Sequence, residues 1–387
     1  MLDPPAKPFS SFFVGGFECS TQRRRDRRRL DLIAATKHDQ FVAQDYQELK
    51  RCGIHTVRDG LRWHLIENST GHYDWATFLP MLRAAHRNQT QVVWDLCHYG
   101  WPDEIDIWSA AFVDRFARFA GAVAAIIANE SDEVPFYCTV NEISFWAWAA
   151  CHARRLQPAA AGRANEFKRQ LVRATIAAVD AIRSVDPRAR FVQTEPLINV
   201  AARSNRSKAR RGADEYHLAQ YEALDMLIGT LAPELGGNAD YLDILGLNYY
   251  PHNQWMLGGR IIEFGHPHYR PLSELLTEAH KRYGKPMFIA ETGAEGSARA
   301  AWLFYICQEV RAAIFAGVPV EGVCLYPVLD YPGWENARHC DVGLLGPADK
   351  AGHRAVYAPL ASELARQQGL FISDEATADS QRKRATG

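Results

Sequence analysis

Eight short apolar runs that end in polar or aromatic residues constrain the fold of this chain more than any other feature. They cover residues 12–17, 54–58, 92–98, 136–142, 190–195, 242–250, 287–291 and 323–326. Helical patterns lie between them, such as the apolar spacing of Phe112, Phe116 and Phe119. Alternating strands and helices pair in parallel through right-handed crossovers. The alternation therefore predicts an α/β chain that folds as a single (β/α)8 TIM barrel.

An open doubly wound sheet is the alternative α/β architecture. It would carry a glycine-rich phosphate loop after the first strand, but residues 15–20 read Gly-Gly-Phe-Glu-Cys-Ser and lack the G-x-G-x-x-G spacing. The length of 387 residues accommodates a barrel of ~250 residues with loop insertions. Because no internal linker interrupts the chain, we expect one barrel domain over residues 9–372, followed by a disordered polar tail over residues 373–387.

The net charge and the cysteines of the chain indicate which partners it can bind and in which cellular compartment it resides. The formal net charge is −1, so the field of the whole molecule attracts neither nucleic acid nor an anionic membrane. The chain has no basic, apolar leader and no stretch of ~18 apolar residues. The eight cysteines form no C-x-x-C pair, and most lie within apolar runs, as in a reducing compartment. These features predict a cytoplasmic protein without a metal site or cofactor, and they leave its oligomeric state open.

Two of the expected strands end in a glutamate. Glu142 closes the fourth run, and Glu291 closes the seventh. The sheet anchors the backbone of such a residue while its carboxylate reaches the rim of the barrel, where a substrate can meet it. A pair of carboxylates in this place is the minimum equipment for cleaving a glycosidic bond. Taken alone, each glutamate more often pairs with an arginine or caps the next helix.

The sequence around these glutamates resembles the family 1 glycoside hydrolases and the related retaining glycosidases. Residues 139–142, Thr-Val-Asn-Glu, are similar to the T-x-N-E acid/base motif at the fourth strand, with Ile143 in place of the usual proline. Residues 289–293, Ile-Ala-Glu-Thr-Gly, are similar to the I-T-E-N-G nucleophile motif at the seventh strand. The resemblance implies that Glu142 is the general acid/base and that Glu291 is the nucleophile.

The resemblance covers most of the chain. Residues 96–99 are similar to the L-Y-H-W segment of the third strand, residues 246–250 match G-x-N-Y-Y, and residues 326–334 are similar to W-S-L-L-D-N-F-E-W. The resemblance implies a set of substrate-binding residues: Gln22, Arg58, His98, Asn141, Asn248, Tyr250, Tyr326 and Trp334. Among them, Arg58 and Tyr250 would keep Glu291 ionised. Gln22, His98 and Asn141 would contact sugar hydroxyls, and Trp334 would stack on a sugar face.

One departure from the family bears on the substrate. The family carries a sugar-gripping glutamate before the last tryptophan of the eighth-strand motif, whereas this chain has Gly333 there and Glu335 on the other side of Trp334. Loss of that carboxylate predicts weak recognition of plain glucosides and leaves the sugar open. The arginine-rich segment 23–29 fits a solvated loop paired with acidic neighbours better than a clamp for an anionic substrate.

A retaining β-glycosidase that acts on a small glycoside or oligosaccharide is the leading hypothesis. In that mechanism Glu291 attacks the anomeric carbon while Glu142 protonates the leaving group. One alternative is a transglycosidase, which uses the same glycosyl-enzyme but passes the sugar to an acceptor other than water. Another is a barrel that binds carbohydrate without turnover, which the fold alone permits. A carbohydrate is the expected partner in each case, with no nucleic acid and no membrane.

Overall fold

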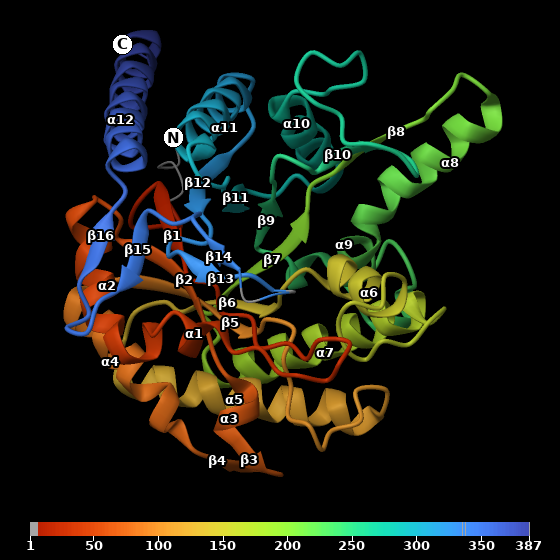
Figure 1. Ribbon diagram of the computed structural model, residues 1–387, viewed down its shortest axis with the longest axis vertical. Helices are drawn as coiled ribbons and strands as arrows, with labels where there is room; N and C mark the ends of the chain where they lie inside the picture. The colour runs from red at the N-terminus through yellow and green to blue at the C-terminus, as the bar shows by residue number, and fades with distance from the viewer. Residues whose placement is uncertain (1–6, 335, 337, 387) are drawn as a thin grey trace.

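A closed barrel of eight parallel strands forms the centre of the molecule (Figure 1). The computed structural model describes residues 7–334, 336 and 338–386, with residues 375–386 described by their backbone alone. The barrel strands are β1 (Phe13–Gly16), β2 (Thr56–Gly60), β5 (Gln91–Cys97), β6 (Phe136–Val140), β7 (Arg190–Pro196), β9 (Ile244–Asn248), β11 (Met287–Thr292) and β12 (Val320–Leu325). Each pairs in parallel with two neighbours, and β1 pairs with β12 to close the barrel. The predicted (β/α)8 barrel is confirmed, and each of the eight runs contributes one strand.

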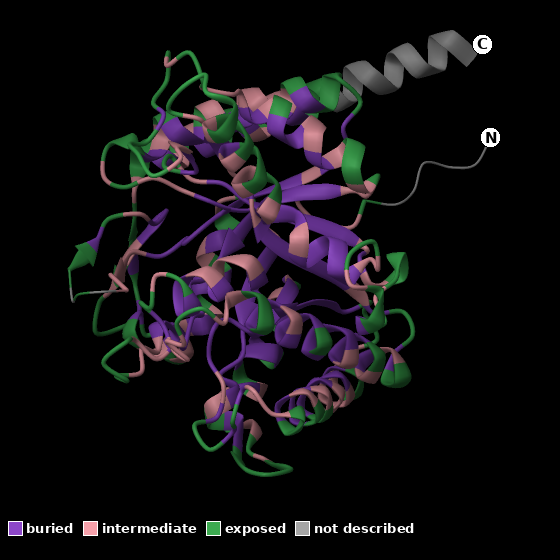
Figure 2. Cartoon of the chain, turned by 90° about the vertical axis from the view of Figure 1, so that its right-hand side faces the viewer, coloured by how far each residue is buried: buried purple, intermediate pink, exposed green. Residues whose placement is uncertain are grey.

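Helices surround the barrel. They are α1 (Leu32–Ala35), α2 (His38–Arg51), α3 (Trp63–Ile66), α4 (Leu79–Asn88), α5 (Ala110–Glu130), α6 (Ile143–Cys151), α7 (Ala164–Val185), α8 (Ser207–Leu218), α9 (Glu222–Leu227), α10 (Leu272–Tyr283), α11 (Ala298–Phe315) and α12 (Ala358–Thr386). Their apolar sides face inward: in α5, Phe116 and Phe119 are fully buried, and the ring of Trp63 packs on both. Figure 2 shows the buried strands inside and the exposed outer sides of the helices.

Short two-stranded sheets lie in the connections that follow barrel strands. They are β3 (Glu67–Ser69) with β4 (His72–Tyr73), β8 (Asn199–Ala201) with β10 (Gln254–Met256), β13 (Tyr331–Pro332) with β14 (His339–Cys340), and β15 (Leu345–Ala348) with β16 (Arg354–Val356). Strands β3, β8, β10 and β13 come after β2, β7, β9 and β12 in the chain. These insertions therefore build up the C-terminal side of the barrel, where enzymes of this fold carry their active sites.

Side chains fill the interior of the barrel. Successive residues of a strand point to opposite faces. In β11, Phe288 and Ala290 belong to the interior cluster, whereas Met287 and Ile289 pack with the helices. Phe9, which precedes β1, adds its ring to the interior cluster at a centroid distance of 4.9 Å from the ring of Phe288. The interior is thus a packed core and not a pore, and in barrels of this kind ligand sites lie at the C-terminal ends of the strands.

The C-terminal helix bears on the expected domain boundary. The backbone of α12 continues to Thr386, and side chains from residue 375 onward lie outside the described residues. The boundary at residue 372 and the disordered tail therefore stay predictions. Within the described ranges, no helix is both long and apolar enough to cross a bilayer. All eight cysteines are free thiols, and all but Cys52 are buried.

Candidate active site

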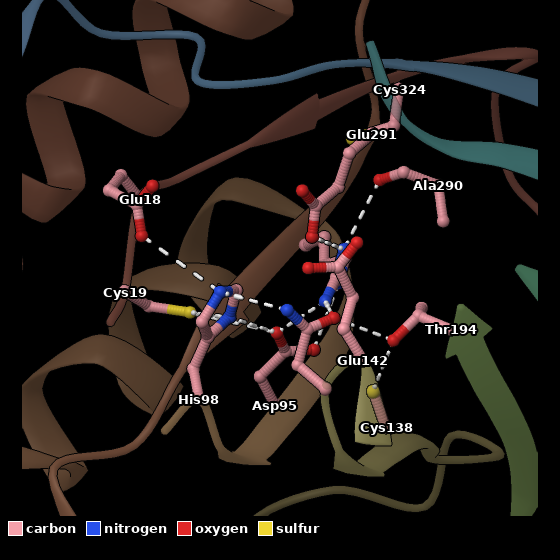
Figure 3. A network of polar contacts seen from close by, with 12 residues as sticks. Glu18, Cys19, Asp95, His98, Cys138, Glu142, Thr194, Ala290, Glu291 and Cys324 are labelled. Atoms are coloured by element: carbon pink, nitrogen blue, oxygen red, sulfur yellow. Dashed lines mark hydrogen bonds and ion pairs between the residues drawn. The ribbon is translucent and has the colours of Figure 1, made fainter. Parts of the chain in front are cut away.

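Glu142 and Glu291 lie at the C-terminal ends of β6 and β11 and belong to one polar network (Figure 3). Glu142 is the second residue after β6, has a left-handed φ of 44° and directly precedes α6. A non-glycine residue in this conformation is strained, and such residues cluster at functional sites. Glu291 follows an irregularity in the pairing of β11 with β9, a feature that can redirect a side chain at a strand end. The two residues are 8% and 5% exposed, respectively.

Arg58 of β2 is fully buried at the centre of this network. Its Nη1 donates to Glu291 Oε1 at 2.8 Å and to the carbonyl of Ala290 at 3.2 Å. Its Nε and Nη2 donate to the two carboxylate oxygens of Asp95 at 3.0 and 2.7 Å. Burial acts to lower the pKa of Arg58, but Asp95 and Glu291 together raise that pKa well above its ordinary value. The guanidinium is therefore a fixed positive charge beside Glu291.

Two donors hold the carboxyl group of Glu291. Arg58 occupies Oε1, and the hydroxyl of Tyr250 donates to Oε2 at 3.0 Å. Burial and the charge of Glu291 raise the pKa of Tyr250 well above its ordinary value, so this hydroxyl keeps its proton. The guanidinium and the hydroxyl therefore fix the orientation of this carboxyl group, with one donor on each oxygen.

The surroundings of Glu142 differ from those of Glu291, because Glu142 has no cationic partner in the part of the chain that the structure describes. Among the described residues no arginine or lysine pairs with it, and the hydroxyl of Tyr99 donates to its Oε2. Burial and the charge of Glu291 raise the pKa of Glu142 to about 8, against the opposing effect of the Tyr99 hydrogen bond. Glu142 is therefore protonated at neutral pH. A carboxyl group that keeps its proton is suited to acid catalysis, and it lies beside a second carboxyl group that Arg58 and Tyr250 hold in place.

Asn141 and His98 are already hydrogen-bonded within the protein. Asn141 Oδ1 accepts from Arg58 Nη2 at 2.5 Å, and Asn141 Nδ2 lies 2.9 Å from His98 Nε2 and 3.0 Å from the hydroxyl of Tyr99. The other ring nitrogen of His98, Nδ1, lies 2.9 Å from Asp95 Oδ2. The carboxylate of Asp95 only accepts, so Nδ1 carries the proton and Nε2 accepts from the amide of Asn141. A ligand that contacts Asn141 or His98 would therefore form hydrogen bonds to atoms that are already hydrogen-bonded within the protein.

Gln22, Asn248 and Tyr326 hold the unpaired polar atoms of the predicted set. Both amide atoms of Gln22, both amide atoms of Asn248 and the hydroxyl of Tyr326 lack a hydrogen-bond partner, although each residue is at most 2% exposed. Leaving a buried polar group unpaired costs about 1–3 kcal/mol. Gln22 follows β1, Asn248 ends β9 and Tyr326 follows β12, so all three lie on the C-terminal side of the barrel. Hydroxyl groups of a ligand can satisfy them there.

Several polar residues of the network were not among the predicted site residues, including Glu18, Asp95, Tyr99 and Thr194. Asp95 pairs with Arg58, Tyr99 donates to Glu142, and Glu18 Oε2 accepts from the indole Nε1 of Trp334 at 3.2 Å. Trp334 is half-buried, and its ring lies edge-on to that of Tyr99 at 5.6 Å. Asp95 had a sequence signal, because it is the only acidic residue in the apolar run 92–98.

Two of the arginines in segment 23–29 pair with one aspartate. Arg23 and Arg29 both bind the carboxylate of Asp103. Arg23 has a side chain that is 31% exposed, and that of Asp103 is 53% exposed. These contacts agree with the interpretation of a loop paired with acidic neighbours. Glu335, the carboxylate beside Trp334 in the sequence, lies outside the described residues.

Among the residues that the structure describes, two groups of side chains bring ligand atoms close enough together for a metal ion. They are Cys19, Asp95 and His98, and Asp330, His339 and Asp341. In the first group, both oxygens of Asp95 already accept from the guanidinium of Arg58. A cation there would have to displace a buried positive charge, so we assign this group to the hydrogen-bond network of Arg58.

Known structures share this fold, although the sequence matches no protein-family model and no curated protein. A family 1 β-glucosidase from Thermotoga maritima is 16% identical, with a TM-score of 0.72 over 86% of this chain and 87% of that chain. The AHE enzyme from Alicyclobacillus herbarius is 19% identical, with a TM-score of 0.74 over 86% and 88%. A β-glucosidase from Thermotoga maritima in complex with deoxynojirimycin is 16% identical, with a TM-score of 0.75 over 94% and 99%. The chain thus has the (β/α)8 fold of the family 1 β-glucosidases.

Proposed function

We propose that the protein is a retaining β-glycosidase. The observation that carries this proposal is the contrast between Glu142, whose pKa burial and Glu291 raise to about 8, and Glu291, which accepts from Arg58 and Tyr250. A glycosidic bond breaks when one group supplies a proton to the leaving oxygen and another supplies negative charge at the anomeric carbon. Solved β-glucosidases of the same fold, one of them in complex with deoxynojirimycin, support a carbohydrate ligand.

In the first step, Glu291 attacks the anomeric carbon and Glu142 protonates the departing oxygen. The products are a glycosyl ester of Glu291 and the free leaving group. The positive charge of Arg58 stays paired during this change. Glu291 loses its negative charge, but Asp95 keeps both of its hydrogen bonds to the guanidinium. Conversion of Glu291 into an ester therefore leaves no unpaired cation in the buried network.

In the second step, Glu142 acts as a base. The charge of Glu291 contributes to the raised pKa of Glu142, and that charge is absent from the ester. The pKa of Glu142 therefore falls in the intermediate, which favours removal of a proton from the incoming water. Attack of this water releases the sugar with retained configuration and restores Glu291. The same two groups thus exchange protonation preferences during one cycle.

The sugar would be held by the predicted binding residues. Gln22, Asn248 and Tyr326 offer buried polar atoms without partners, which are suited to pairing with hydroxyl groups. Trp334 offers an indole ring to an apolar sugar face. Asn141 and His98 would also contact the sugar, while they keep hydrogen bonds to Arg58 and Asp95.

The test is hydrolysis of nitrophenyl β-glycosides of several neutral sugars, with the product anomer followed by NMR. We expect turnover with the β-anomer formed first, and a loss of at least ~10²-fold in kcat for Glu291→Gln. Initial formation of the α-anomer would refute retention. Binding of sugar without turnover would favour the non-catalytic barrel, and accumulation of an alkyl glycoside when an alcohol is added would favour a transglycosidase.

A further inference from the structure

Glu18 is a further buried carboxyl group at this end of the barrel, and the mechanism above does not use it. It is 5% exposed, its Oε1 accepts from the backbone N–H of Ser20 at 3.1 Å, and its Oε2 accepts from Trp334 Nε1 at 3.2 Å. In the described part of the chain no arginine or lysine pairs with it, and the nearest basic group is His98 Nε2 at 4.0 Å (Figure 3). Burial raises the pKa of Glu18. An ionised carboxyl group has acceptor positions for about four hydrogen bonds, so about two remain free.

The backbone around Glu18 is fixed against the barrel. The N–H of Phe17 donates to the carbonyl of Arg58 at 2.9 Å. A Cβ atom at Gly60 would lie 2.5 Å from the sulfur of Cys19, so the glycine allows the chain next to Glu18 to approach the end of β2. Glu18 is therefore held in one place, as a residue that recognises a ligand should be.

Gly333 supplies no carboxylate next to Trp334, and a side chain there would contact Asn336 and Cys340. A Cβ atom at Gly333 would lie 3.3 Å from Asn336 Oδ1 and 3.5 Å from Cys340 Sγ. The next residue, Trp334, instead donates its indole N–H to Glu18. A carboxyl group is thus present beside this tryptophan, but it comes from the end of β1 and not from the loop after β12.

We propose that Glu18 is the specificity-determining carboxyl group of the sugar subsite and that it hydrogen-bonds to hydroxyl groups of a neutral sugar. The inference rests on the proposed function. Glu18 Oε1 lies 4.0 Å from His98 Nε2, and hydrogen bonds from His98 through Asn141 and Arg58 connect this side of the network to Glu291 (Figure 3). A neutral sugar fits, because Glu18, Glu291 and Asp95 outnumber the one cation of the network, Arg58, which is already paired.

The test combines deletion of Glu18 with deletion of single hydroxyl groups. The kcat/KM of wild type and of Glu18→Ala is measured for the best neutral nitrophenyl β-glycoside and for its 3-deoxy, 4-deoxy and 6-deoxy analogues where those hydroxyls exist. In the wild type, removal of a hydroxyl group that Glu18 binds should lower kcat/KM by ~10–100-fold. In Glu18→Ala, removal of the same hydroxyl group should lower kcat/KM by a factor at least ~10-fold smaller, because the carboxyl group that bound it is absent. We call this loss of kcat/KM on removing one hydroxyl the deoxy penalty. The proposal would be overturned if the deoxy penalties of Glu18→Ala stayed within ~2-fold of the wild-type values at all positions.

Glu67→Gln is the matched control. Glu67 is also buried and also accepts from a tryptophan indole, Trp63 Nε1 at 2.8 Å, but it pairs with Arg115 and takes no part in the network of Figure 3. This variant should keep the wild-type penalties. If Glu18→Ala shows no cooperative thermal unfolding, Glu18→Gln replaces it and should change the penalty at the same hydroxyl.

The two proposals fail differently. Retaining turnover by the wild type, together with unchanged penalties in Glu18→Ala, contradicts the role of Glu18 alone. Absence of turnover of every glycoside by the wild type contradicts the proposed function, and the role of Glu18 falls with it.

Discussion

Glu142 supplies the proton in the proposed reaction, and its substitution separates good from poor leaving groups. Glu142→Gln should slow hydrolysis of alkyl glycosides by ~10²–10⁴-fold, since general acid help is worth that much. Activated aryl glycosides depart without protonation, so their glycosylation step should be affected far less. The measurement is kcat/KM across a series of leaving-group pKa values. Equal losses for alkyl and aryl substrates would remove Glu142 from the acid role.

Tyr99 sets the pH range in which Glu142 keeps its proton. The Tyr99 hydroxyl stabilises the ionised form of Glu142, whose pKa burial and Glu291 raise to about 8. Tyr99→Phe removes that hydrogen bond, so the pKa of Glu142 should rise further. Activity is lost as pH rises through this pKa, and the alkaline limb of the kcat/KM profile should therefore move to higher pH. Tyr283→Phe is the control, because that hydroxyl donates to Asp225 instead. A limb that stays in place or moves to lower pH in Tyr99→Phe would contradict this role.

The sequence identified the two glutamates at the rim but not all of their neighbours. Glu142 and Glu291 end apolar runs, a signal that is local in sequence. Glu18 and Tyr99 act through contacts between β1, β5, β6 and β12, which come together only when the barrel closes. The irregularity of β11 before Glu291 is likewise a property of pairing with β9 and not of the run itself.

At the scale of elements, Glu195 of β7 joins its strand to the first turn of α6. Its two carboxyl oxygens accept from the backbone N–H of Ser144 at 3.1 and 3.3 Å, and burial raises its pKa to about 7. The value in an unfolded chain is ~4.3, so the folded state binds this proton more tightly. The stabilisation is complete below about pH 4 and is lost as pH rises through the folded-state pKa.

Glu195→Gln cannot ionise, so its stability relative to wild type should increase with pH. Thermal unfolding at pH 5 and pH 8 measures this, and the Tm difference between variant and wild type should grow by ~2 °C or more over that range. Glu166→Gln serves as the control, since the side chain of Glu166 is 55% exposed. A Tm difference for Glu195→Gln that does not depend on pH would show that ionisation of this residue has no effect on stability.

Barrel strands were predictable because they are short, apolar and buried on both faces. All eight runs became strands, and the burial of β1, β2 and β6 is complete. The small sheets were not predicted. Strands β3 and β4 span only Glu67–Ser69 and His72–Tyr73 and are largely exposed, so they leave no periodic signal.

For the whole molecule, net charge conceals a local imbalance. The chain carries −1 overall, yet carboxyl groups outnumber cations around Arg58, while Arg23 and Arg29 are held by Asp103. Glucuronides and 6-phosphoglucosides should therefore have kcat/KM values at least ~100-fold below those of the best neutral glycoside, since like charges in close contact cost several kcal/mol. Preference for an anionic glycoside would contradict this and would assign the arginine segment 23–29 to the substrate.

The central claim is that Glu291 forms a covalent bond with the sugar. The most direct measurement is incubation with an activated 2-deoxy-2-fluoro β-glycoside of each sugar that the enzyme hydrolyses, followed by mass spectrometry of the intact protein and of its peptides. The fluorine slows the second step, so the intermediate should accumulate. We predict one added glycosyl group per chain, located on the peptide that contains Glu291 and absent from Glu291→Gln. A label on another residue, or full turnover of the parent glycoside without any label, would contradict the account.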